Sequence, residues 1–300
     1  MTISAAENVP QQPANLSWAD KQLINAVSNT NSNCCTRLPL TSLRNFCVKA
    51  ALFCGADPNT KDQFGMTALH HAAQNDNVQQ IRQLVAARAN LDLPDRYGSL
   101  PIDFAIITGN QAASTELINQ IKNRFASSAV ECLQKRNQFN QAPLHMAAAF
   151  NRNLTVAELL AAGVHPDGIT TAASNLCKMP LHYAAENCNI KLMHLLQAYG
   201  ANIYALDPIQ GTVFHILARK DHPESRKCLE SFITDPAESL IPFAGQRVID
   251  VACPENRALL ERVCSRLQNQ RNHVLRLYKA KENLNKILAS KATAASFLKK

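Results

Sequence analysis

Similar nine-residue segments recur along this chain of 300 residues at intervals close to 33 residues. Five of them align without gaps, and a shorter sixth segment, GQRVID, ends at Asp250. The steps between their last residues are 33, 42, 37, 33 and 35 residues. Such a period predicts a stack of repeated units, in which each unit buries its apolar face against its neighbours. The aligned segments are DQFGMTALH ending at His70, DRYGSLPID at Asp103, NQFNQAPLH at His145, SNLCKMPLH at His182 and DPIQGTVFH at His215.

Each segment leads into two short apolar runs separated by a polar break. The first run is rich in alanine, as in HHAA, HMAA and HYAA, which lets neighbouring units approach closely. The second run places Leu and Ile at helical spacing, as in IRQLVAA and LMHLLQAYG. The connectors, such as GADPNTKDQFG, contain the Gly, Pro, Asp and Asn residues of tight turns. We therefore expect an all-α chain of helix-turn-helix units joined by short hairpin-like connectors.

The strings TALHHAA, APLHMAA and MPLHYAA resemble the T-P-L-H-x-A-A signature of the ankyrin repeat, and GADPN resembles its closing G-A-D-V-N. The resemblance covers roughly residues 37–267 and implies an ankyrin-repeat solenoid of about six or seven units. The end copies are degenerate, as terminal repeats with a more polar outer face must be. We expect a disordered segment over residues 1–16, the solenoid over residues 17–267 and a basic helical tail over residues 268–300.

The resemblance implies a non-enzymatic scaffold that binds a protein partner through its concave face. Because ankyrin proteins share a fold and not a target, it does not name that partner. In this family the residue after each segment lies on the inner helix that faces the groove. Aromatic and Met side chains there would form an apolar stripe of the kind enriched at binding surfaces. Packing between repeats is an equally good interpretation of the same residues. The stripe comprises His71, Phe104, Met146, Tyr183 and Ile216, with Ile107 and Arg219 three positions further on at its edge.

Three aromatic residues recur at one offset in the connectors. Phe64, Tyr97 and Phe139 would lie at connector tips that flank the groove. Their recurrence indicates partner contact, although each hairpin must also pack on its neighbour. Asn59 in GADPN matches the asparagine that some ankyrin proteins offer to an oxygen-sensing hydroxylase, which makes it a candidate modification site.

Two insertions interrupt the period. The insertion after Asn123 keeps helical spacing and lacks Gly and Pro, which predicts a longer outer helix. The insertion after Gly163 contains Pro166 and Gly168, which predicts a longer connecting loop.

Motifs of catalysis are missing from the sequence. It contains no glycine-rich phosphate loop, HExxH, CxxC or GxSxG, so we expect no enzyme activity, no cofactor and no small-molecule substrate. The anchor histidines would stand one per repeat, too far apart to share a metal ion. The resemblance implies that each of them forms a structural hydrogen bond between adjacent turns. The ten cysteines are scattered through a chain without an export signal, which predicts reduced thiols.

Positive charge is concentrated in the C-terminal part of the chain. Residues 255–300 hold eleven Lys or Arg against three Glu, which equals the whole formal charge of +8. This part has helical spacing, and it could fold back as a cap, form a coiled coil, or lie on an anionic membrane or nucleic acid. Its last residues, ASKATAASFLKK, resemble the C-terminal export signals of bacterial type IV effectors. That resemblance implies, as an alternative function, a bacterial effector secreted into a host cell; otherwise, without a membrane span or secretory signal, we expect a cytoplasmic protein.

Overall fold

The structure is a computed structural model that describes residues 16–28, 40–168 and 178–297. The segment expected to be disordered lies, apart from Leu16, outside these residues. The chain divides into two compact units, one of residues 1–187 and 191–202 and one of residues 188–190 and 203–300. Within the described ranges, no helix combines the length and the apolar character needed to cross a membrane.

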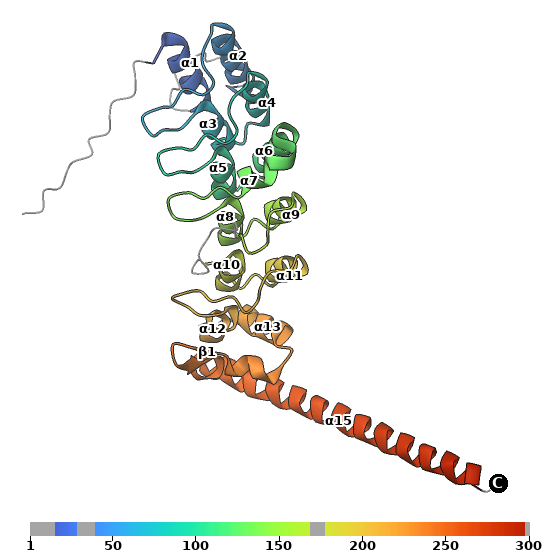
Figure 1. The fold of residues 1–300 in the computed structure, drawn as a ribbon. Helices are drawn as coiled ribbons and strands as arrows, with labels where there is room; N and C mark the ends of the chain where they lie inside the picture. The colour runs from blue at the N-terminus through green and yellow to red at the C-terminus, as the bar shows by residue number, and fades with distance from the viewer. Residues whose placement is uncertain (1–15, 29–39, 169–177, 298–300) are drawn as a thin grey trace, which may run out of the picture. The chain divides into compact units, whose positions relative to one another are not determined.

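The first unit consists of paired helices in two rows (Figure 1). In the inner row α3 packs on α5, α5 on α8 and α8 on α10, while α4, α6 and α9 pack on one another in the outer row. The connectors project from the inner row (Figure 1). The helices are α1 (Trp18–Val27), α2 (Leu40–Phe53), α3 (Ala68–Gln74), α4 (Val78–Ala86), α5 (Pro101–Thr108), α6 (Gln111–Phe125), η1 (Ala126–Ser128), α7 (Ala129–Leu133), α8 (Pro143–Ala149), α9 (Asn153–Ala161), α10 (Pro180–Glu186) and α11 (Ile190–Ala198).

The inner helices begin where their sequence dictates. Three of them have proline in their first turn, where its missing N–H costs nothing and its fixed φ suits the helix. The anchor residue three positions into the helix then accepts the N–H of the residue that precedes the helix, which satisfies a donor that has no partner inside the helix. These bonds join Nδ1 of His70 to Thr67 (3.0 Å), Oδ2 of Asp103 to Leu100 (2.8 Å), Nδ1 of His145 to Ala142 (3.3 Å) and Nδ1 of His182 to Met179 (3.0 Å).

Polar side chains also bind one repeat to the next. Nε2 of His70 donates to the carbonyl oxygen of Ser99 at 3.2 Å, which confirms the predicted histidine link at this anchor. Nδ2 of Asn110 donates to the carbonyl oxygens of Ala73 and Gln74, the last residues of α3. The carbonyl groups at the end of one inner helix are thus satisfied by the following repeat, as helix termini require.

The second unit continues the pattern of helix pairs and adds a small hairpin. Phe214 and Phe232 are fully buried and form the centre of its core. With its two pairs, α12 with α13 and α14 with α15, the described part of the chain has seven helix pairs, in agreement with the expected six or seven units. The elements are α12 (Val213–Arg219), α13 (Pro223–Phe232), η2 (Pro236–Leu240), β1 (Pro242–Phe243), β2 (Gln246–Arg247), α14 (Val248–Val251) and α15 (Pro254–Phe297), with β1 and β2 antiparallel.

Helix α15 is one helix of 44 residues (Figure 1). Leu259, Leu260 and Val263 are buried, so its first part closes the last repeat as the sequence predicts. Of the three alternatives for the tail, folding back as a cap is excluded, because the helix continues without a turn to Phe297. The side chains of residues 268–273 are exposed.

The insertion after Asn123 differs from its prediction. α6 ends at Phe125, Ala126 takes a φ of 41°, and the chain continues through η1 into the separate short helix α7. The predicted lengthening is confirmed, because α6 has 15 residues where the outer helices α4 and α9 have nine each, but the expectation that one helix runs through the whole insertion is wrong. The break allows Ala129, Cys132 and Leu133 of α7 to become buried, whereas a straight helix would continue past the end of its neighbour α4. The insertion after Gly163 is a loop as far as Gly168, and residues 169–177 lie outside the described residues.

Candidate protein-binding surface

Four connectors contain a similar turn, which we call a finger. Each finger begins with Asp or Asn, whose side-chain Oδ1 accepts two backbone N–H groups further along the turn, a local bond typical of these residues. The acceptors and donors are Asp62 with Phe64 and Met66 (2.8 and 2.9 Å), Asp95 with Tyr97 and Ser99 (both 2.8 Å), Asn137 with Phe139 and Gln141 (both 3.0 Å), and Asp207 with Ile209 and Gln210 (both 2.7 Å).

Backbone conformation completes three of these fingers. The fourth turn residue is left-handed in each, with φ of 77° at Gly65, 78° at Gly98 and 60° at Asn140. Glycine and asparagine tolerate this region best. A turn followed by a left-handed residue is a common hairpin connection, so the sequence of the finger determines its backbone.

The third residue of each finger is apolar and points into solvent. The exposed fractions are 55% for Phe64, 55% for Tyr97, 65% for Phe139 and 83% for Ile209. Sequence reasoning predicted the three aromatic tips and missed Ile209. The signal was available, because all four residues lie six positions before their anchor residue.

Successive fingers of the first unit are joined through their backbones. The N–H of Arg96 donates to the carbonyl oxygen of Phe64 at 3.3 Å, and the N–H of Gln138 donates to that of Tyr97 at 2.9 Å. Phe64, Tyr97 and Phe139 therefore form a row with a fixed spacing, which we call the finger row.

The predicted stripe on the inner helices is not an open surface. His71, Met146 and Ile216 are buried, while Phe104 and Tyr183 are half-buried. The Phe104 ring meets the edge of His70 with the ring centroids 5.4 Å apart. The expectation of a continuous exposed stripe is therefore wrong, and packing accounts for its buried members.

Two of the buried stripe residues support the fingers. Nε2 of His71 lies 2.9 Å from Oδ2 of Asp62, and Nδ2 of Asn137 lies 4.0 Å from the sulfur of Met146. In both places the side chain after the anchor contacts the residue that begins the finger. The inner helix thus helps to hold the turn whose tip faces solvent.

The remaining predicted residues are accessible to differing degrees. Ile107 is exposed, and Arg219 is exposed with its guanidinium donating to the carbonyl oxygen of Gln210 at 3.0 Å. The ring of Tyr183 is covered by Lys178, whose Nζ lies 4.5 Å from the ring centroid, and its hydroxyl accepts a hydrogen bond from Gln141. Tyr183 consequently offers only part of its ring to a partner.

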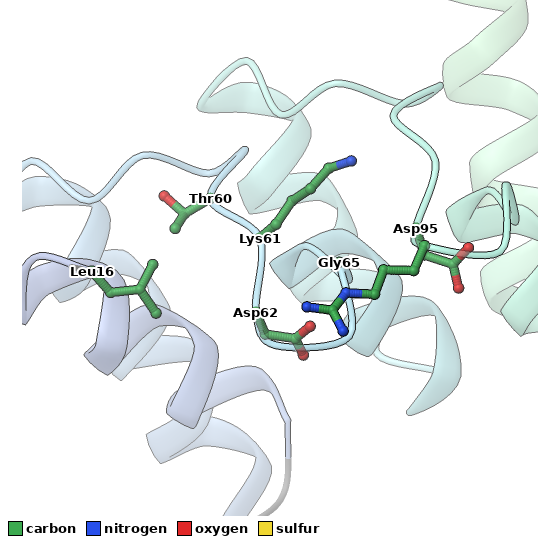
Figure 2. A pocket seen from close by; sticks show the side chains of 7 residues that line it. Leu16, Thr60, Lys61, Asp62, Gly65 and Asp95 are labelled. Carbon is green, nitrogen blue, oxygen red and sulfur yellow. The ribbon is translucent and has the colours of Figure 1, made fainter. Parts of the chain in front are cut away.

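A cavity of about 380 Å³ lies between the first two fingers (Figure 2). Asp62 and Gly65 line it from the first finger, and Asp95 and Arg96 line it from the second. Leu16, Thr60 and Lys61 complete the lining beside the two turns that present Phe64 and Tyr97.

Three of the cysteine thiols are buried, which makes them harder to ionise. Burial raises the pKa of the Cys132 thiol to about 11 and that of Cys228 to about 12, and it raises the pKa of Cys188 as well. Thiols in this state are poor nucleophiles at neutral pH. Cys177 lies outside the described residues.

Asn59 is half-buried, its Oδ1 accepts the N–H of Asn90 at 2.7 Å, and its hydroxylation stays a prediction.

One exposed cluster in the second unit has possible metal-binding atoms. Ligand atoms of Asp221, Cys253 and Glu255 lie within 4.8 Å of one another. Asp221 is already paired with Arg226 at 3.0 Å, and such groups are common on surfaces without an ion. We assign no metal to them.

The paired helices and fingers define a helical repeat protein of the solenoid class. Comparison with known proteins identifies the repeats. The family described as ankyrin repeats (three copies) matches residues 23–126, and the single ankyrin repeat matches residues 178–205. The chain therefore contains ankyrin repeats, whose fold is typical of protein-protein interaction domains, and no catalytic family is indicated.

Similar proteins share the repeats over part of their length. The potassium channel SKOR of Arabidopsis thaliana is 40% identical over 81 residues, which is 27% of this chain and 10% of that protein. The putative ankyrin repeat protein FPV244 of fowlpox virus (strain NVSL) is 27% identical over 189 residues, 52% of this chain and 27% of that protein. The ankyrin repeat domain of Bcl-3 superposes with a TM-score of 0.61 at 20% identity, covering 80% of this chain and 97% of that domain, and shows the fold alone.

Proposed function

We propose that this chain is a non-enzymatic scaffold that holds a protein partner against the finger row. The observation that carries the proposal is the repeated presentation of an apolar side chain to solvent by a turn that its own Asp or Asn stabilises. Burying these side chains in an interface releases ordered water without requiring the fingers to reorganise.

The chemistry of the row suits protein recognition. Phe and Tyr are enriched at interface centres, because each buries a large rigid surface at a low entropic cost. The backbone bonds from Arg96 to Phe64 and from Gln138 to Tyr97 fix the three tips before binding. The row of rings is therefore preorganised, and binding gains affinity because the partner does not have to order the fingers.

The test compares two triple variants of the full chain. The finger variant carries Phe64→Ser, Tyr97→Ser and Phe139→Ser. The control variant carries Phe46→Ser, Phe53→Ser and Leu154→Ser, at exposed apolar residues of α2 and α9 in the same unit. Both must show the circular dichroism and melting temperature of the original chain. Affinity capture from a lysate then identifies proteins that the original chain and the control retain.

The expected result is that the finger variant loses its captured partner and the control does not. Binding of the purified partner, measured by calorimetry, should weaken by about thirtyfold or more, because the loss of even one hot-spot aromatic residue costs about 2 kcal/mol or more. Equal binding by both variants would refute the finger row as the binding surface.

A second candidate function rests on α15. The exposed Arg271, Arg276 and Lys279 give this helix a basic surface beyond the last repeat. An anionic membrane or nucleic acid would bind it with an affinity that falls steeply from low to moderate salt. Replacing all three residues with Gln should weaken binding to phosphatidylserine vesicles about a hundredfold, because each basic residue near an anionic membrane contributes about 1 kcal/mol, and it should weaken binding to duplex DNA as well. Binding to neutral vesicles that matches the anionic ones would exclude this function.

The effector hypothesis, with secretion into a host cell, has its own test. A reporter fused to residues 270–300 should leave the bacterium through a type IV system. A reporter that stays inside the bacterium would reject the C-terminal export signal and leave the cytoplasmic location as the working hypothesis.

A further inference from the structure

The cavity between the first two fingers is lined by the positively charged side chain of Arg96, whose guanidinium has no partner among the described residues. Arg96 is exposed, and its Cγ lies where a Cβ on Gly65 would meet it, so the aliphatic stem packs over that glycine. Among the described residues, no hydrogen bond or ion pair reaches its guanidinium. Lys61, the residue before the first finger, also lines the cavity, and its Nζ donates to the carbonyl oxygen of Pro94 at 2.6 Å.

Each carboxylate that lines the same cavity is hydrogen-bonded within the protein. Oδ1 of Asp62 accepts two backbone N–H groups, and its Oδ2 lies 2.9 Å from Nε2 of His71. Asp95 is buried and its Oδ1 accepts two backbone N–H groups of its own finger. The cavity therefore offers hydrogen-bond donors to a ligand, from the guanidinium of Arg96 and from the ammonium group of Lys61.

We propose that this cavity binds the carboxylate of an Asp or Glu side chain in the protein segment that lies on the finger row. The inference rests on the proposed function and specifies its partner, which carries an acidic residue next to an apolar one. The apolar residue contacts Phe64 and Tyr97, the tips of the two fingers that form the cavity. Arginine suits the acidic residue because its planar fork binds a carboxylate through two parallel hydrogen bonds.

A carboxylate fits this cavity better than a phosphate group. A phosphate monoester carries a charge between −1.5 and −2 at neutral pH. Such a dianion would lie close to Asp62 and Asp95, whose charges are stabilised by fixed hydrogen bonds within the fingers. A carboxylate, with its single negative charge, is attracted by the free guanidinium and the lysine and is repelled less by the two aspartates.

The experiment screens the full-length chain against a displayed library of random dodecapeptides. The original chain should enrich peptides with Asp or Glu beside an aromatic or aliphatic residue. Arg96→Glu should enrich Lys or Arg at the acidic position. The control Lys122→Glu reverses an exposed charge on α6, away from the fingers, and should keep the acidic preference.

Anisotropy titrations of one enriched peptide then measure the contact. Arg96→Met keeps the stem over Gly65, removes the charge, and should weaken binding about tenfold to a hundredfold, the range expected for a charged hydrogen bond. Changing the peptide's Asp to Asn should weaken binding to the original chain by a similar factor and have little effect on Arg96→Met. A melting curve for each variant establishes that it is folded.

The outcomes separate this inference from the proposed function. Apolar peptides that depend on the finger tips and show no acidic preference would overturn the carboxylate site and leave the finger row standing. Acidic peptides that depend on Arg96 but still bind the finger variant would overturn the finger row and leave the carboxylate site standing. Stronger binding of a phosphoserine peptide than of its Asp counterpart would overturn the choice of carboxylate, and no enrichment by the folded chain would overturn both proposals.

Discussion

Asp103 accepts the backbone N–H of Leu100 through Oδ2 at 2.8 Å while its own carboxyl group is fully buried. It occupies the position that histidine holds in four other repeats. Burial raises the pKa of the Asp103 carboxyl from 3.8 to about 8, with the nearby charge of Asp95 acting in the same direction. The carboxyl group is therefore mostly protonated at neutral pH, where an ordinary aspartate would be charged.

Stability should consequently decline as the pH rises through this window. Between pH 3.8 and about 8 the unfolded chain has released the Asp103 proton and the folded chain keeps it, so the free energy of unfolding falls as the pH rises. Asp103→Asn cannot titrate. Urea unfolding at pH 5 and pH 8 should show a loss in the original chain that exceeds the loss in the variant by ~2 kcal/mol or more. Parallel pH profiles of the two proteins would contradict the buried carboxyl.

His70 should give a pH dependence of the opposite sign. Burial lowers the pKa of His70 from 6.5 to about 4. The unfolded chain therefore binds a proton below pH 6.5 that the folded chain resists, and stability is lost as the pH falls from 6.5 towards 4. Compared with His70→Gln, the original chain should lose ~2 kcal/mol more between pH 7 and pH 4.5. A profile of the original chain that runs parallel to that of His70→Gln would contradict the buried imidazole.

The side chain that begins a finger should be needed as a hydrogen-bond acceptor, a role that a neutral amide oxygen fills as well as a charged carboxylate. Asp95→Ala removes the acceptor for the N–H groups of Tyr97 and Ser99, so hydrogen exchange at both amides should accelerate. Peptide or partner binding should weaken several-fold because the Tyr97 tip is no longer held. Asp95→Asn is the matched control, since Asn137 performs the same task in its own finger. Loss of protection in both variants would show that the charge is required.

Gly168 should not accept a side chain. It has a φ of 62°, and a Cβ there would overlap the ring of the buried His145. Gly55 has a φ of 85° with open space around it, so Gly55→Ala measures the backbone strain alone. We expect ~1 to 2 kcal/mol of destabilisation for Gly55→Ala from strain and ~1 to 3 kcal/mol more for Gly168→Ala from overpacking. Equal melting temperatures for the two variants would contradict the contact with His145.

The positions of the helices could be predicted from sequence because their signals are local. Proline in the first turn and the anchor side chain three positions into the helix act over one turn, so each inner helix begins where these residues place it. The insertion after Asn123 was predicted only in part: the outer helix α6 is longer, but its end at Phe125 was missed because helical spacing continues through Ala126. The chain breaks there, and residues of α7 become buried.

The candidate site divides in the same way. The offset of six residues before the anchor predicts the tips Phe64, Tyr97 and Phe139, and the same rule applied once more would have found Ile209. The stripe of His71 and its equivalents could not be assigned, because a residue on an inner helix either faces solvent or packs beneath a finger. Only the position of the finger above it decides between the two.

The sequence by itself determined the repeat, the helix pairs, the turns and the apolar tips, because each depends on contacts between residues close together in the chain. Tertiary structure alone decided that His71 and Met146 lie under the fingers and that Arg96 faces a cavity with an unpaired guanidinium among the described residues. These features depend on how one repeat covers the next. Burial between repeats is a property of their packing, which the periodicity of a single sequence does not specify.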